Sequence, residues 1–204
     1  MSSDETSPGK GAATRQRIVG CAVARFAQDG FRQTSVAQVA RDAGVTSQAV
    51  HAHFGSKEAL FHAAFEHDVE GLLGVFTARV AHGPIAGSPG SPLALIPALL
   101  GELESHPLAR RILQGHEADR TRELLDLPAI ARTREQLTQL VAGAQQGGAV
   151  RDDLTPEALA GALETLTLAL LLGAVQVGMI GDDQRRLAIL AILLQGIQPP
   201  AGRA

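Results

Sequence analysis

The stretch DAGVTSQAVHAHFGSKEALF, residues 42–61, holds a glycine turn, a short helical segment, a second turn and the start of another helix. Just before and within it, Ala40, Gly44 and Val50 have the spacing of a helix-turn-helix. There a small residue lets two helices touch, a glycine takes the left-handed turn, and a valine anchors the second helix from beneath. The outer side of that second helix then carries small and amide side chains of the kind that reach base edges in a major groove, namely Thr46, Ser47, Gln48, Ala49 and Ala52.

Helix signals surround this motif. Thr14 is expected to cap a first helix that Gly30 ends, with Ile18, Ala22 and Phe26 on its apolar face. Residues 34–35 can cap a second helix, and Thr46 a third that runs to about residue 53. These helices are short and closely connected, which favours one small three-helix unit.

Composition agrees with an all-α fold. The chain has 204 residues, of which 45% are hydrophobic, with six Phe but no Tyr or Trp, and it is rich in Leu and Ala. One cysteine excludes an intrachain disulfide, and no apolar run follows Met1 as in a signal peptide. The longest apolar window, residues 165–180, is shorter than the roughly 20 residues of a membrane helix. We therefore expect a cytoplasmic protein without a membrane partner.

Charge divides the chain in two. Residues 10–60 carry seven basic side chains against three acidic ones, whereas residues 68–204 carry eleven against fifteen. This difference is expected when one part of a protein meets a polyanion. We predict a flexible arm over residues 1–12, the three-helix unit over 13–60 and a second helical unit over 61–204.

Several motifs occur together along residues 14–67. They are Phe26 with Gly30-Phe31, Thr34-Ser35-Val36, Val39-Ala40, Ala43-Gly44-Val45-Thr46, and HFGSKEALF at residues 53–61. In this combination the segment resembles the DNA-binding domain of the TetR family of bacterial transcriptional repressors. The resemblance implies an N-terminal three-helix DNA reader joined to a larger helical domain for ligand binding and dimerisation.

The resemblance also implies roles for individual residues. Thr34 is expected to touch phosphate at the start of the second helix, residues 46–49 to face bases, and Lys57 to contact phosphate at the start of the fourth helix. Independently, Ser56 is a natural N-cap, and free N–H groups at a helix start beside a lysine form an anion site. The alternative is that Ser56 and Lys57 form only a solvated cap.

His51 and His53 depart from the family, which usually has an aromatic hydroxyl in at least one of these positions. Histidine can also donate a hydrogen bond to phosphate, and it can become cationic near neutral pH. We expect both to lie near DNA phosphates, or alternatively to pack and hydrogen-bond while neutral. On a helix they point about 200° apart and cannot chelate one ion. His62 and Glu66 lie one turn apart, but two ligands do not make a site, so no metal or cofactor is predicted.

The second unit is expected to contain further amphipathic helices, over residues 61–81, 93–104, 108–125, 128–145, 156–179 and 183–197, with a Gly/Pro loop at 83–92. A pocket for an apolar or amphipathic effector is predicted among them, with candidate residues Phe65, Leu72, Phe76, Leu99, Leu103, His116 and Leu172.

The last two of these helices are apolar almost all round, so they are expected to pair with their copies in a homodimer. The predicted interface residues are Leu166, Leu170, Leu187, Leu190, Leu194 and Ile197. A wholly intramolecular core is the alternative.

Three functions are compatible with these patterns. The first is a dimeric repressor that an effector releases from a palindromic DNA operator. The second is a similar regulator without a small-molecule ligand, controlled by concentration or a protein partner. An enzyme is disfavoured, because no Gly-rich phosphate loop, nucleophile elbow, metal quartet or Ser/His/Asp arrangement occurs.

Overall fold

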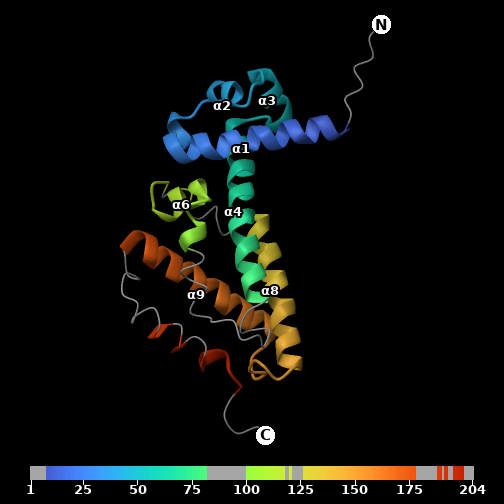
Figure 1. Cartoon of the computed structure of the whole chain (residues 1–204), viewed down its shortest axis with the longest axis vertical. Helices are drawn as coiled ribbons and strands as arrows, with labels where there is room; N and C mark the ends of the chain where they lie inside the picture. The colour runs from blue at the N-terminus through green and yellow to red at the C-terminus, as the bar shows by residue number, and fades with distance from the viewer. Residues whose placement is uncertain are drawn as a thin grey trace.

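The computed structural model describes residues 8–81, 100–117, 120, 126–177, 188–189, 191–192 and 195–199. Over these residues all regular secondary structure is helical, as predicted. The helices are α1 (Pro8–Gln33), α2 (Val36–Asp42), α3 (Ser47–Phe54), α4 (Lys57–Ala81), α6 (Pro107–Leu113), α8 (Pro128–Gln146) and α9 (Pro156–Val177). Helices α1–α3 form a head at one end, and α4 runs from it into the group formed by α6, α8 and α9 (Figure 1).

The first helix begins earlier than expected. Its first residue is Pro8, so residues 8–12, which we expected to be unstructured, are helical, and Thr14 lies inside the helix. Proline suits a first helical position because its missing N–H would have no intrahelical partner there. Gly30 interrupts the helix, as predicted, with φ 77° and ψ 169°. Such a conformation is essentially confined to glycine.

Phenylalanine rings form the centre of the head. Phe26, Phe61 and Phe65 are fully buried. The ring of Phe61 lies nearly perpendicular to the rings of Phe26 and Phe31, with centroids 5.1 and 5.3 Å away. Edge-to-face pairs of this kind add to the free energy gained by burial. Because Phe61 and Phe65 belong to α4, the first turns of α4 complete the core of the head.

Helix α4 therefore belongs to both parts of the molecule. It begins at the predicted cap, where Ala59 N donates to Ser56 Oγ at 3.0 Å. It packs against α1 in the head and against α8 further along (Figure 1). A change of tilt in α4 would consequently move the head relative to the other helices.

Helix α6 starts on a carboxylate that belongs to α4. Its own N-cap residue, His106, makes no side-chain cap. Instead Asp68, which is buried, accepts hydrogen bonds from Leu108 N at 2.9 Å and Ala109 N at 2.8 Å, while its other oxygen lies 3.2 Å from His106 Nδ1. The predicted helix over residues 108–125 was too long. Helix α6 ends at Leu113, because the chain enters a turn in which Gly115 has φ 81°.

Helices α8 and α9 lie side by side. The predicted restart is confirmed, since Ala158 N donates to Thr155 Oγ1 at 3.2 Å and Pro156 is the first residue of α9. Helix α9 is little buried for so apolar a helix, as its expected pairing with a copy would require. Among its 22 residues, those classed as buried are Leu159, Ala160 and Leu171. The predicted loop at 83–92 and most of the predicted helix at 93–104 lie outside the described residues.

Candidate DNA-binding surface and inner cavity

The helix-turn-helix predicted from spacing is present in α2 and α3. Ala40 and Val50 are 2% and 1% exposed, and Gly44 takes the left-handed turn with φ 63°. Thr46 caps α3 by accepting a hydrogen bond from Ala49 N at 3.1 Å. Each residue in the pattern thus has the structural role that its spacing predicted.

The outer side of α3 is open to solvent. Thr46, Ser47 and Gln48 are exposed and Ala49 is half-buried. Their backbone positions follow directly from the buried anchor Val50, which fixes the rotation of α3 against the core. A major groove accepts one helix of this length, and the amide of Gln48 can both donate to and accept from an adenine edge.

The two histidines of α3 are exposed but have different neighbours. His51 Nδ1 lies 3.2 Å from the carbonyl oxygen of Gly55, and the His53 ring centroid lies 6.1 Å from that of Phe54. A carbonyl only accepts, so the contact with Gly55 selects the form of His51 that carries a proton on Nδ1. Nε2 of neutral His51 then has a lone pair, and only the cation can donate a second hydrogen bond from Nε2.

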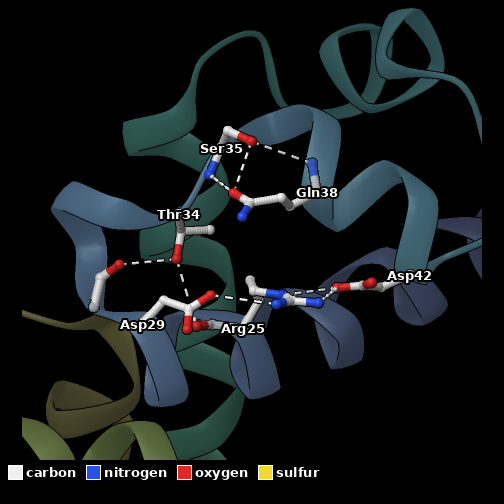
Figure 2. A network of polar contacts seen from close by, with 7 residues as sticks. Arg25, Asp29, Thr34, Ser35, Gln38 and Asp42 are labelled. Carbon is white, nitrogen blue, oxygen red and sulfur yellow. Dashed lines mark hydrogen bonds and ion pairs between the residues drawn. The ribbon is translucent and has the colours of Figure 1, made fainter.

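Thr34 does not have the role that the resemblance implied. It is 2% exposed, and its hydroxyl donates to Gly30 O at 2.8 Å, so the side chain is turned into the protein (Figure 2). The surface position at the start of α2 is taken by Ser35. Ser35 forms a capping box with Gln38, in which each side chain bonds the other residue's backbone N–H. In a sequence, such a cap is indicated by a Ser or Thr that is followed three residues later by Glu or Gln.

Arg25 is a basic residue of the head that is already neutralised. Its guanidinium contacts Asp42 at 2.7 Å and Asp29 at 3.3 Å, which joins α1 to the end of α2 (Figure 2). The hydrogen bond to Asp42, and then the one to Asp29, raise the pKa of Arg25. Nearby, Arg17 Nε donates to Ala43 O at 2.9 Å. These arginines hold the helix-turn-helix on α1, so the positive charge that we counted in the head is not all available to phosphate.

Lys57 lies where α4 begins. Its ammonium group is 4.5 Å from the centroid of Phe31 and donates to Arg32 O at 3.4 Å. Arg120 contacts the same Phe31 ring and the neighbouring Phe61 ring. Its guanidinium carbon lies 3.7 Å from the centroid of Phe31 and 4.6 Å from that of Phe61. Cations are attracted to the faces of aromatic rings. Phe31 thereby connects the predicted phosphate contact with the turn that follows α6.

The end of α1 is also held directly by α6 and its following turn. Arg111 Nη1 donates to Ala27 O at 3.3 Å, and Phe31 N donates to Glu117 Oε1 at 3.1 Å. A β-carbon on Gly30 would lie 2.7 Å from side-chain atoms of both Arg111 and Glu117. Glycine is therefore needed here for its backbone angles, and a β-carbon would also make the ends of the Arg111 and Glu117 side chains shift.

An apolar inner cavity of about 70 Å³ lies among α4, α6, α8 and α9. Its lining residues are Val69, Leu72, Leu73, Phe76, Ala109, Leu113, Ile130, Thr133, Glu164, Thr167, Leu168 and Leu171. Two of the candidates from the sequence, Leu72 and Phe76, are among them. The single acidic residue in this set is Glu164, whose carboxylate forms two hydrogen bonds of 2.7 Å with Arg134.

Other pocket candidates lie elsewhere. Phe65 is buried in the core of the head, Leu103 is buried away from this lining, and His116 is exposed on the turn after α6. Leu172 is half-buried but does not line the cavity, and Leu99 lies outside the described residues. Periodicity identifies the buried face of a helix but not which buried residues border a hollow, so these four predicted residues lie apart from the cavity. Glu164 had a sequence signal that we missed, because it is the single charge between Glu157 and Asp182.

A second hollow, of about 500 Å³, opens broadly to solvent between α1, α4 and the turn before α6. Its walls are mixed and include His67, Glu70 and His106. No three His, Cys, Asp or Glu side chains come together to hold a metal ion within the described ranges. Of the pair considered from sequence, Glu66 accepts a hydrogen bond from Arg132 at 3.1 Å.

The predicted dimer residues that the structure describes are exposed or half-buried. Leu166 is 42% exposed, and Leu170 and Ile197 are half-buried. Leu187, Leu190 and Leu194 lie outside the described residues. Two further apolar side chains, Val177 and Ile192, are each 68% exposed. Apolar surface is thus concentrated on α9 and the segment after it.

Comparison with known proteins agrees with this geometry. Residues 18–64 match the sequence model of the bacterial regulatory proteins of the tetR family. Over 96% of both chains, the protein is 27% identical to the HTH-type transcriptional repressor KstR2 of Mycolicibacterium smegmatis. Its fold is similar to that of a TetR-family transcriptional regulator from Mesorhizobium loti, with a TM-score of 0.68 and 16% identity over 92% of this chain and 96% of that one.

A further fold neighbour is the multidrug-binding protein EbrR in complex with proflavin. The TM-score is 0.58 with 22% identity, over 88% of this chain and 99% of that one. The family match covers the head, and the fold matches extend through the C-terminal helices. Residues 18–64 therefore form a DNA-binding domain of the tetR family, and with its helix-turn-helix, its charge distribution and these relatives the chain is a DNA-binding transcriptional regulator.

Proposed function

We propose that this regulator is a homodimeric repressor that a small apolar or amphipathic effector releases from a palindromic operator. The observation that carries the proposal is the inner cavity, because α4 lines it with Val69, Leu72 and Phe76 and also carries Lys57 at the head. A ligand releases DNA only by binding more tightly to the conformation that does not fit DNA. Because α4 reaches both the cavity and the head, a change in its position would couple the two.

The size of the cavity supports a conformational change on binding. Pockets for drug-sized ligands measure roughly 300–1,000 Å³, several times the 70 Å³ present here. An effector would therefore have to separate the surrounding helices. Helix α6 lines the cavity with Ala109 and Leu113 and also carries Arg111, which bonds the end of α1. Displacement of α6 would thus reach the head through Arg111.

The same small volume also favours the second candidate, a regulator of this fold without a small-molecule ligand. The two functions differ in one measurement. An operator would first be selected from random DNA, and its affinity would then be measured against a panel of metabolites and amphiphiles. A compound that binds the protein and weakens operator binding supports the first function, whereas a panel that binds without any effect on DNA counts against it.

The homodimer is supported by the exposed apolar residues of α9. This helix is long and apolar enough to span a membrane by length and composition alone, with 17% of its most apolar window buried. The charge of Glu164 near its middle and its packing against α8 favour a protein partner instead. In the proposed interface Leu166 would meet its copy. Leu166→Glu should therefore shift the protein toward monomer in sedimentation velocity, whereas Glu135→Gln on α8, also exposed, should not.

A further inference from the structure

We infer that the inner cavity takes a cationic amphiphile, whose positive head group replaces Arg134 as the partner of Glu164. This inference rests on the proposed function, since it names the effector class for the same cavity. It starts from an asymmetry between the two ion-pair partners. The side chain of Glu164 is 17% exposed and lines the cavity, whereas that of Arg134 is 52% exposed and does not.

The asymmetry decides which partner a ligand can replace. If Arg134 is displaced, its guanidinium turns into water, and an exposed ion pair of this kind contributes little free energy. If Glu164 is displaced, a carboxylate that is mostly buried against apolar walls loses its only ion-pair partner among the described residues, which costs much more. A cationic ligand leaves both groups satisfied, while an anionic ligand bound to Arg134 leaves Glu164 unpaired.

The walls determine the remainder of the ligand. Beyond Glu164, the cavity is lined by the apolar side chains of Leu72, Phe76 and Leu168, together with the two hydroxyl-bearing residues Thr133 and Thr167. Such walls fit a hydrocarbon tail and offer no cation to a phosphate or carboxylate. A positive head group at the rim and an apolar tail inside are the arrangement that matches these surroundings.

The ion pair also joins the two helices that must separate. Arg134 belongs to α8 and Glu164 to α9, and both helices contribute to the cavity wall. A ligand that takes Glu164 from Arg134 removes one polar connection between α8 and α9 as it enters. The charge of the ligand would thereby assist the widening that its volume requires.

The test compares decylammonium, decanol and decanoate, which have the same chain and different head groups. Binding to the full-length protein is measured by calorimetry, and release of the selected operator by fluorescence anisotropy. Charge-assisted hydrogen bonds are strong enough for about tenfold tighter binding of decylammonium than of decanol. Glu164→Gln should remove that preference. Glu135→Gln, which changes an exposed carboxylate of α8, should keep it.

A second variant should change the affinity for decylammonium in the opposite direction. Arg134→Gln removes the competitor for Glu164 and should tighten decylammonium binding several-fold. If wild-type protein prefers decanoate or decanol, or if Glu164→Gln retains the preference for the cation, the inference is wrong. Release of the operator by one of those two probes would then leave the ligand-responsive function standing. If no probe binds, the inference is wrong, and the panel of metabolites and amphiphiles still decides the proposed function.

Discussion

The head and the C-terminal helices bury their apolar residues in different ways. In the head, Phe26, Phe61 and Phe65 are fully enclosed within one chain, and the short helices α2 and α3 are capped. Helix α9 is more apolar than α1, yet Leu166 and Val177 remain exposed. The head is thus determined by its own packing, whereas α9 has a sequence suited to partners outside the single chain.

The largest expected effect tests that contrast directly. Phe61→Ala should lower the free energy of unfolding by about 3–5 kcal/mol, since it leaves a cavity between the head and α4. Leu166→Ala should cost roughly 0.5 kcal/mol or less in dilute protein, where the side chain faces water. Urea denaturation at low and high protein concentration measures both. If the two variants lost the same free energy of unfolding at both protein concentrations, α9 would be as self-contained as the head.

Gly30 tests how closely the two regions fit together. Gly30→Ala forces a side chain into a glycine-only conformation against Arg111 and Glu117, and should destabilise the protein by about 1–3 kcal/mol. Gly20→Ala is the matched control on the same helix, where nothing lies within 4 Å of the new atom. It should raise stability by roughly 0.5–1 kcal/mol. Thermal denaturation compares them, and a harmless Gly30→Ala would show that the approach of α6 is loose.

Within the head, base recognition and phosphate contact are expected to depend on different residues. Gln48→Ala should cost about 1–3 kcal/mol of binding, mainly at one base step in each half of the operator. Lys57→Ala should weaken binding to all sequences alike and reduce the salt slope by about one. Anisotropy titrations on the selected site and on single-base variants provide both numbers. Uniform loss for Gln48→Ala would mean that this residue does not read bases.

The smallest expected effect is a dependence of operator affinity on pH. If Nδ1 of His51 stays bonded to Gly55 O, only the His51 cation can donate to a phosphate, so binding takes up a proton. Affinity should then rise as the pH is lowered, because the complex binds more protons than its free parts. His51→Tyr should flatten this dependence. His53→Tyr should leave it in place, and a flat profile for the wild type at fixed ionic strength would exclude the mechanism.

The sequence predicted the head better than the remainder for a physical reason. Gly44, Val50 and the caps Ser35 and Thr46 act over a few residues, so their spacing is enough to locate them. Thr34 shows the limit of this, because Thr and Ser can both cap a helix and only packing decides which one turns inward. Cavity residues such as Val69, Ala109 and Leu168 come from different helices, and their meeting depends on helix crossings that no local pattern contains.

The contact between Asp68 and the start of α6 has a consequence for observation. The first amide hydrogens of a helix usually exchange quickly with solvent, because they have no intrahelical acceptor. Leu108 and Ala109 are protected here by a carboxylate on another helix. Their exchange rates therefore report the separation of α6 from α4 rather than fraying of α6 itself. Two amide signals would record that movement in solution without any label attached to the protein.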